Sequence, residues 1–283
     1  MNTERIVVLG SSGFIGSHVL ARAQALECEV LGITSRDADL LRPEAIPLLA
    51  SLLRHGDIVV HSAAIAPARN ATEAAANLDM TANLAKAVEG IELQQVVVVS
   101  SDAVYGNQSG VVTEETVCAP DSFHGLMSVG RELACADIQT DVLTIVRPAP
   151  VYGLGDTHNS YGPNRFVRQA LSEGRISVFG AGEAGRDHVA IADVADIIVC
   201  SIKQTEGGVI NVASGQMRSF AQVAEVVQST SPSLVDVVST GSESRPTFRT
   251  FDLSGLTRRF PDHVPTNPER GIQAMFHSMA AGQ

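Results

Sequence analysis

Short apolar runs rich in β-branched residues alternate with longer Ala- and Leu-rich segments over the first 150 residues. The apolar runs show no polar alternation and predict strands buried on both faces, at residues 5–10, 28–33, 57–64, 94–101 and 142–148. The segments between them, at 15–26, 43–54, 71–89 and 124–138, have a helical spacing of apolar residues. Strand–helix alternation of this kind predicts an α/β fold with a parallel sheet and right-handed crossovers.

The pattern loosens after about residue 150. Residues 151–164 are rich in Gly, Asn and Tyr and predict a loop. Further helices are expected at 164–174, 193–204, 219–230 and 268–281, with Gly174 near the end of the first and Asp193 as N-cap of the second, and a strand at 208–215. These shorter elements predict a smaller C-terminal α+β lobe, so we divide the chain into residues 1–165 and 166–283, with the chain passing back and forth between the two parts.

Charge and composition narrow the range of partners. Acidic residues outnumber basic ones 31 to 20, for a net charge of -11, and aromatic residues are only 4% of the chain. Both features argue against binding to nucleic acid or to an anionic membrane. The first ten residues lack the build of a signal peptide, no apolar stretch approaches the ~20 residues of a membrane helix, and the four cysteines are scattered. We therefore expect a cytoplasmic protein without a metal site.

Three glycines follow the first predicted strand and open the first predicted helix. They are Gly10, Gly13 and Gly16, in GxxGxxG spacing, and the same turn contains Phe14 and Ile15. The first glycine permits a tight turn, the second lets a pyrophosphate approach the backbone at the helix N-terminus, and the third permits close helix–strand packing. The position of the triplet between strand and helix predicts a dinucleotide-binding loop.

The end of the second strand indicates which dinucleotide binds. An acidic residue there accepts hydrogen bonds from the adenosine 2′-hydroxyl of NAD, whereas an arginine accommodates the 2′-phosphate of NADP. The chain has Thr34 at the position of the acid, followed by Ser35 and Arg36, which favours NADP. In the alternative interpretation Asp37 takes the place of the acid and the cofactor is NAD.

Seven motifs occur in a characteristic order: GSSGFIG, DIVVHSAA, NLDMTANLAKA, VVVVSSDAVYG, VRPAPVYGLG, VFGAGEAGRDHVAIADVA and GGVINVASG. As a set they resemble the extended short-chain dehydrogenase/reductase family, of the NAD-dependent epimerase/dehydratase type that modifies nucleotide sugars. The resemblance covers essentially the whole chain. It implies a Rossmann-type, doubly wound parallel sheet that binds the dinucleotide, followed by a substrate-binding lobe, and it implies a small-molecule substrate.

The resemblance also implies roles for individual residues. On the cofactor side, these are Ala63 and Ala64 against the ribose, Asp39 and Leu40 near the adenine, and Asn83 in the helix behind the active site. Ser101 matches the serine or threonine that hydrogen-bonds the substrate oxygen, and Asp102 matches an acid of some dehydratases. The glutamate that accompanies that acid is here Ala103, which disfavours dehydration. For the diphosphate of a nucleotide sugar, the matching residues are Arg186 and Arg245.

The family's catalytic YxxxK pair is not conserved in this sequence. Counting back from Glu132 places His124 at the tyrosine position and Ser128 at the lysine position. An imidazole titrates near ~6.5 and needs no neighbouring cation to activate it, so His124 is a candidate acid/base. Histidine is shorter than tyrosine, however, and serine cannot reach as far as lysine toward the ribose, so participation of Asp102 or Tyr161, or simple loss of the active site, is the competing interpretation.

Three functions follow from these residues. The first is an NAD(P)-dependent ketoreductase or epimerase acting on a nucleotide sugar or a similar hydroxylated substrate. The second is a non-redox enzyme that uses His124 and Asp102 for proton transfer or elimination. The third is a catalytically inactive nucleotide-binding sensor or partner subunit. The resemblance further implies a homodimer formed by the helices at 71–89 and 124–138, whose apolar residues include Leu78, Met80, Leu84, Leu126, Met127 and Leu133.

Overall fold

A computed structural model describes residues 5–202, 204–241 and 246–282. Its chain divides into two compact units. The first comprises residues 1–107, 114–148 and 194–211, and the second comprises residues 108–113, 149–193 and 212–283. The units are therefore interleaved along the chain and do not follow a single cut at residue 165; where the chain divides into folding domains stays a prediction.

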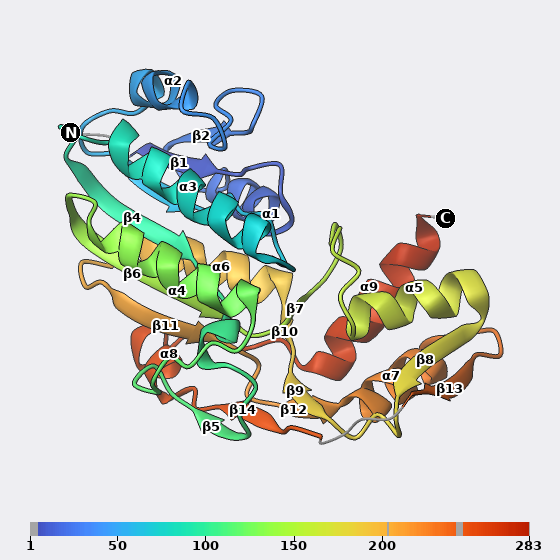
Figure 1. The fold of residues 1–283 in the computed structure, drawn as a ribbon. Coiled ribbons are helices and arrows are strands. Elements are labelled where there is room, and N and C mark those ends of the chain that lie inside the picture. Colours follow the sequence, from blue (N-terminus) through green and yellow to red (C-terminus); the bar gives the residue numbers. More distant parts are fainter. Residues whose placement is uncertain (1–4, 203, 242–245, 283) are drawn as a thin grey trace. The chain divides into compact units, whose positions relative to one another are not determined.

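A six-stranded sheet forms the centre of the first unit. Its strands are β1 (Arg5–Leu9), β2 (Glu29–Ile33), β3 (Ile58–His61), β4 (Leu93–Val99), β6 (Thr140–Pro148) and β11 (Gly208–Val212), in the order β11-β6-β4-β3-β1-β2 (Figure 1). The pairs β1–β2, β1–β3, β3–β4 and β4–β6 are all parallel. The predicted α/β fold with a Rossmann-type parallel sheet is confirmed.

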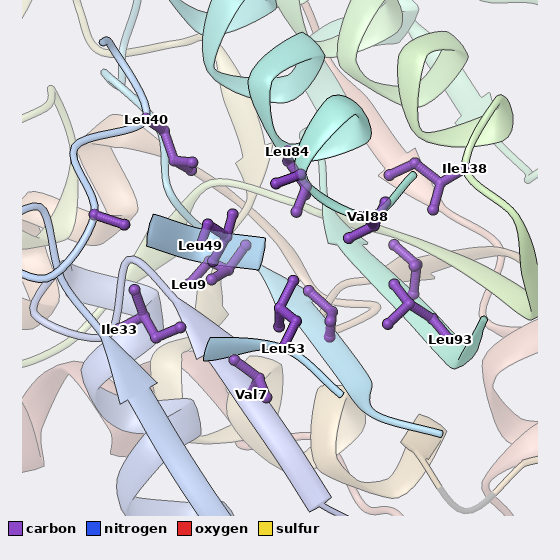
Figure 2. Close-up of a cluster of buried hydrophobic side chains, with 14 of the residues drawn as sticks. Val7, Leu9, Ile33, Leu40, Leu49, Leu53, Leu84, Val88, Leu93 and Ile138 are labelled. Atoms are coloured by element: carbon purple, nitrogen blue, oxygen red, sulfur yellow. The ribbon is translucent and has the colours of Figure 1, made fainter. Parts of the chain in front are cut away.

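Helices cover both faces of this sheet because its strands are apolar on both sides. Figure 1 shows α3 and α4 side by side over one face, with α1 and α6 behind the sheet. The helices are α1 (Phe14–Ala23), α2 (Ala45–Leu52), α3 (Ala71–Ala87), α4 (Phe123–Ala136) and α6 (Ile191–Ile202). On the face of α2, α3 and α4, buried side chains of the helices pack against those of the strands, among them Leu9, Leu49, Leu84 and Leu93 (Figure 2).

The strand order places a topological switch point between β1 and β3. From β1 the chain moves to β2 on one side, and it then returns to β3 on the other side, so the loops that follow β1 and β3 separate at the carboxyl edge of the sheet. In the register of the two strands Leu9 is paired with His61, so both strands end at the same level. Ligands of doubly wound sheets bind at such a point.

The second unit consists of shorter elements. Its strands are β5 (Gly110–Val112), β7 (Val151–Tyr152), β8 (Arg175–Phe179), β9 (Gly185–Asp187), β10 (Val189–Ala190), β12 (Met217–Ser219), β13 (Asp236–Thr240) and β14 (Arg249–Phe251), and they form two-stranded pairs. Its helices include α5 (Pro163–Glu173), α7 (Phe220–Thr230), α8 (Ser254–Arg259) and α9 (Pro268–Ala281). Buried residues of α5, α7 and α9, such as Phe166, Val227 and Phe276, form its core.

Most predicted elements begin and end within a few residues of the observed ones. Gly174 caps α5 in the left-handed conformation, as expected from its place in the sequence. The prediction for Asp193 was wrong: α6 begins at Ile191, so Asp193 lies inside the first turn. Its carboxylate accepts hydrogen bonds from the backbone N–H and the hydroxyl of Thr266, both at 2.8 Å, and so joins two segments of the chain.

Candidate functional site

The glycine loop after β1 is packed tightly against its own backbone and that of Ala63. Gly10 has a φ of +77°, and a Cβ there would lie 2.6 Å from the Cα atom of Ala63. A Cβ at Gly16 would lie 2.1 Å from the carbonyl oxygen of Gly10. At Gly13, the N-cap of α1, the nearest atom would be that oxygen at 3.2 Å, and no side chain caps the helix. The N-terminus of α1 thus has no side-chain cap, and a helix N-terminus is a place where anionic ligands bind.

The two other residues assigned to this loop begin helix α1. Phe14 is buried and makes an edge-to-face contact with His18, with the ring centroids 6.0 Å apart. Ile15 is half-buried. Neither position conflicts with the predicted loop, whose fit to a pyrophosphate rests on the glycines.

The turn after β2 contains both residues that could select the cofactor, Arg36 and Asp37. The carboxylate of Asp37 accepts hydrogen bonds from the backbone N–H of Thr34 at 2.9 Å and from its hydroxyl at 2.7 Å. These two bonds lower the pKa of Asp37. Ser35 and Arg36 are both exposed, and the Arg36 backbone N–H donates to the Thr34 hydroxyl at 3.2 Å. Asp37 thus stabilises the turn, while the side chain of Arg36 extends from it.

Helix α3 holds the segments that follow β2 and β3. Asn83 donates to the carbonyl of Leu40 at 2.9 Å, and Leu40 itself is buried in the core. Asp39 forms an ion pair with Arg42 at 3.3 Å. The sequence predicts Asn83 as a site residue but does not predict its bond to Leu40, and it assigns no role to Asn77.

Asn77 is the residue that fixes the backbone beyond Ala63 and Ala64. It is fully buried, accepts from the N–H of Ile65 at 2.9 Å and donates to the Ile65 carbonyl at 3.0 Å. Ala63 is half-buried and Ala64 is exposed. Asn77 lies 13 residues after Ala64 along the chain, so the spacing in the sequence gave no signal for this anchor.

Ser101 and Asp102 lie at the start of a short 3-10 helix, η1 (Asp102–Tyr105), just beyond the end of β4. Ser101 is the N-cap of η1, and its hydroxyl accepts from the backbone N–H of Ala103 at 3.1 Å. The same hydroxyl lies 3.5 Å from a carboxylate oxygen of Asp102, which is buried. The turn therefore places a serine hydroxyl and a carboxyl group next to each other at the carboxyl edge of the sheet.

A glycine brings the start of α4 against η1. A Cβ at Gly125 would lie 2.3 Å from the carbonyl oxygen of Ala103 and 3.0 Å from Pro120, so only glycine allows this approach. His124, the preceding residue, is half-buried. Its Nδ1 atom accepts a hydrogen bond from the backbone N–H of Ala68 at 3.5 Å. The structure thus brings the elements of Ser101, Asp102 and His124 together, and Gly125 is the physical reason.

Ser128 has a different environment from the one expected. It is fully buried, and its hydroxyl donates to the backbone carbonyl of His124, one turn earlier, at 2.8 Å. Such a bond within the helix occupies the hydroxyl and keeps it against the backbone. The role of Ser128 as a site residue therefore stays a prediction. The contact observed for its side chain is with α4 itself.

A buried polar network lies behind these residues. The carboxylate of Glu132 accepts from Ser100 and from two nitrogens of Arg147, at 2.9 and 2.6 Å. Arg147 donates in turn to the Tyr105 hydroxyl at 2.9 Å, and Tyr105 donates to Asn211 at 2.8 Å. Burial would lower the pKa of Arg147, but its bonds to Glu132 and Tyr105 outweigh burial and raise it. The network joins Ser100, the residue after β4, to η1, α4, β6 and β11.

The second unit contains Arg186, whereas Arg245 lies outside the described residues. Arg186 is half-buried in β9, and its guanidinium donates to the Gly185 carbonyl at 2.8 Å and to the carbonyl and hydroxyl of Thr247, both at 2.9 Å. These contacts hold the guanidinium in a fixed orientation.

Two neighbours of Arg186 were not recognised from the sequence. Asp187 is buried and accepts from the N–H and hydroxyl of Ser214 and from the N–H of Gly215; burial raises its pKa against the effect of these bonds. His188 is buried beside Phe220, and burial together with the charge of Arg186 lowers its pKa to about 3. A buried histidine of this kind stays neutral near pH 7.

Neither a membrane-spanning helix nor a cluster of metal ligands occurs among the described residues. None of their helices combines the length and the apolar character that crossing a bilayer requires. The same ranges contain no group of three or more His, Cys, Asp or Glu side chains arranged to hold a metal ion.

The parallel sheet, the switch point and the glycine loop together define a dinucleotide-binding fold of the Rossmann type. Residues 6–213 match the model of the NAD dependent epimerase/dehydratase family, and the chain belongs to this family.

The chain is similar to several enzymes named for nucleotide sugars. The chain is 27% identical to dTDP-4-dehydrorhamnose reductase of Mycobacterium tuberculosis, over 90% of this chain and 88% of that protein. It is 25% identical to an uncharacterized UDP-glucose epimerase of Bacillus subtilis, over 79% and 81%. Among solved structures, UDP-glucuronic acid 4-epimerase of Bacillus cereus, in complex with UDP-glucuronic acid and NAD, is similar with a TM-score of 0.84 and 22% identity over 99% and 100% of the two chains. RMD of Pseudomonas aeruginosa, complexed with NADPH, is similar with a TM-score of 0.84 and 21% identity over 99% and 100%.

Proposed function

We propose that this protein is an NAD(P)-dependent ketoreductase or epimerase acting on a nucleotide sugar or a similar hydroxylated substrate. The observation that carries the proposal is the packing of α4 on η1 through Gly125, which keeps His124 at the same edge as Ser101. The glycine loop and the uncapped start of α1 fit the pyrophosphate of the dinucleotide, with Ala63 and Ala64 along the ribose. When bound, the nicotinamide supplies hydride transfer.

In this proposal His124 and Ser101 act on the substrate oxygen. The bond from the Ala68 N–H makes Nδ1 of His124 an acceptor, so the proton of the neutral imidazole is on Nε2. Nε2 then donates this hydrogen toward the substrate oxygen, while the Ser101 hydroxyl holds that oxygen in place. Ser128 acts through the helix by binding the His124 carbonyl and does not contact substrate.

NADP is the proposed cofactor because Asp37 is already committed to Thr34. An acid that accepts two hydrogen bonds within its own turn competes poorly for ribose hydroxyls, whereas the exposed Arg36, next to Ser35, can meet a 2′-phosphate in pairs of hydrogen bonds. Replacing Arg36 by Ala is expected to weaken NADP⁺ binding about 10-fold or more and to change NAD⁺ binding less than about 3-fold. The Asp37→Ala variant is the matched control, and a larger loss for NAD⁺ than for NADP⁺ in that variant would make NAD the cofactor.

The substrate is proposed to carry a diphosphate that Arg186 binds. The guanidinium is held by Gly185 and Thr247, so its orientation is set before a ligand arrives. For Arg245, which lies outside the described residues, the same role stays a proposal from the resemblance alone.

The test of the whole proposal is calorimetric titration with NADP⁺, NAD⁺ and their reduced forms, followed by a screen of nucleotide sugars and 4-keto nucleotide sugars. Wild type is expected to turn over at least one of them, and His124→Gln is expected to lose about 100-fold or more in kcat while keeping dinucleotide affinity. Binding without turnover of any substrate, with no effect of His124→Gln on ligand binding, would favour the inactive sensor instead.

A second candidate function is a non-redox enzyme. The observation that favours it is the burial of Asp102 within 3.5 Å of the Ser101 hydroxyl, which places a carboxyl group where it can move a proton. Turnover that continues with a redox-inactive cofactor analogue, and that falls in Asp102→Asn, would select this candidate.

The proposed assembly is a homodimer formed through α3 and α4. Of the six apolar residues named for this contact, Leu78, Leu126 and Leu133 are exposed, whereas Met80, Leu84 and Met127 are buried. Exposed leucines on two adjacent helices are typical of an interface. The Leu126→Glu/Leu133→Glu variant is expected to run as a monomer in sedimentation, with unchanged circular dichroism. A wild-type chain that sediments as a monomer would overturn the assembly.

A further inference from the structure

Arg131 in α4 lies three residues after Ser128, and it is the only described arginine whose guanidinium we find bound at the ends of both β3 and β4. Its side chain is buried, with 2% of the residue exposed. Nη1 donates to the carbonyl of Val99 at 2.9 Å, and Nη2 donates to the carbonyls of Ala63 at 3.1 Å and His61 at 3.4 Å. Arg131 therefore binds the ends of two neighbouring strands at the carboxyl edge of the sheet.

Among the described residues no carboxylate forms an ion pair or hydrogen bond with Arg131, although the neighbouring Glu132 attracts its charge. Arg5, equally buried, forms bonds of 2.8 and 2.6 Å with Asp57, and Arg147 is bound in the same way by Glu132. Glu132 follows Arg131 directly in the chain, but its oxygens are taken by Arg147 and Ser100. Arginine stays charged even when buried, so Arg131 contributes a buried positive charge at this edge of the sheet.

The contacts of Arg131 join the two halves of the site in the first unit. The backbone of Ala63 is the wall against which Gly10 packs. Val99 is the last residue of β4, and the chain continues from it through Ser100 to Ser101. One side chain thus fixes the wall of the glycine loop relative to the strand that leads to the proposed substrate-binding serine.

We propose that Arg131 is a positioning residue that supplies the buried positive charge at the carboxyl edge of β3 and β4 and holds these two strand ends together for an anionic dinucleotide. Ser128 carries no charge, so within α4 the cation near this edge comes from Arg131, one turn further along the helix. The inference rests on the proposed function, because it needs a dinucleotide to bind at this edge.

The experiment is calorimetric titration of the full chain with NADP⁺, NAD⁺ and ADP-ribose in wild type, Arg131→Met and Arg131→Lys. Methionine removes the charge and the three bonds, whereas lysine keeps the charge and has three N–H donors for three carbonyls. We expect Arg131→Met to bind all three ligands about 10-fold or more weakly, the effect of a unit charge acting through ~10 Å of protein. Arg131→Lys is expected to recover affinity to within about 3-fold of wild type.

Leu93→Ala is the matched control for loss of stability. Arg131 binds the carbonyl of Val99 at the end of β4, and Leu93 is buried at the opposite end of that strand. The Leu93→Ala variant should therefore lower the melting temperature and leave dinucleotide affinity unchanged. Where Arg131→Met does not fold, Arg131→Gln replaces it, and the comparison of Lys with Gln decides.

Two results would overturn the inference. One is an Arg131→Met chain, or its Gln replacement, that binds within twofold of wild type; the other is an Arg131→Lys chain that loses as much affinity as the uncharged variant. A wild-type chain that binds no dinucleotide overturns the proposed function and this inference together. Equal binding by wild type and Arg131→Met overturns the inference alone.

Discussion

The glycine loop after β1 and the start of α4 use the same device with different side chains. At each place a glycine lets two backbone segments touch: Gly10 against Ala63, and Gly125 against the carbonyl of Ala103. The glycine spacing of the loop is the one expected for a dinucleotide-binding turn, whereas the resemblance implies that His124 and Ser128 occupy the tyrosine and lysine positions on α4. Under that prediction, the backbone requirements of a site and its chemical groups change independently.

The two regions also differ in how they are supported. Backbone contacts hold the glycine loop: the N–H groups of Gly10 and Ser11 both donate to the carbonyl of Ile33, at 2.9 and 3.2 Å. Charged side chains hold the other region, through Glu132, Arg147 and the strand ends that they join. Loss of the Glu132–Arg147 ion pair should therefore damage the α4 side and spare the loop.

The largest effect is expected for Glu132→Gln. This change leaves the Arg147 guanidinium buried without its carboxylate, and breaking a buried pair in this way costs about 3–5 kcal/mol of the free energy of unfolding. Chemical denaturation measures the loss. The double variant Glu132→Gln/Arg147→Met is the control, since removing both partners should restore much of the stability. A single variant as stable as wild type would show that the network does not support this region.

A smaller loss of the free energy of unfolding is expected when a methyl group is added at Gly125 or Gly10. In Gly125→Ala the new Cβ would meet the Ala103 carbonyl at 2.3 Å, so α4 must shift away from η1, at about 1–3 kcal/mol. Dinucleotide affinity should stay within about 3-fold of wild type while kcat falls about 100-fold, because the start of α4 moves relative to Ser101.

Gly10→Ala, with its φ of +77°, should instead abolish measurable dinucleotide binding. Parallel titration and turnover assays of the two variants test the separation, and equal loss of dinucleotide affinity in both would disprove it.

The sequence predicted the first of these regions more completely than the second. The glycine triplet predicts a turn between a strand and a helix, and the observed β1 and α1 agree with it, while the dinucleotide stays a prediction. The counting from Glu132 placed His124 and Ser128 in the right helix, but the burial of Ser128 and the three carbonyls bound by Arg131 depend on contacts with β3 and β4, which are distant in sequence. Asp193 was misplaced for the same reason, because its partner Thr266 is 73 residues away.

The smallest expected effect concerns the exposed contact of Asp37 beside the glycine loop. Asp37 accepts from the N–H and the hydroxyl of Thr34, which follows Ile33, and these bonds lower its pKa in the folded chain. A group whose pKa is lowered by folding contributes stability above its unfolded pKa of about 3.9, and this contribution is lost as the pH falls through the lower folded value. The amide signal of Thr34 should therefore titrate in NMR spectra with a midpoint below about 3.9.

The control for that titration is Asp37→Asn, in which the Thr34 amide should show no such step. The amides of Gly10 and Ser11 are expected to move little in either protein, because both donate to the backbone carbonyl of Ile33 and not to a titrating group. Large shifts of the Gly10 amide in step with Asp37 would show that the loop depends on this charge. In that case backbone hydrogen bonds alone would not hold the loop, and its contrast with the start of α4, which is held by charges, would fail.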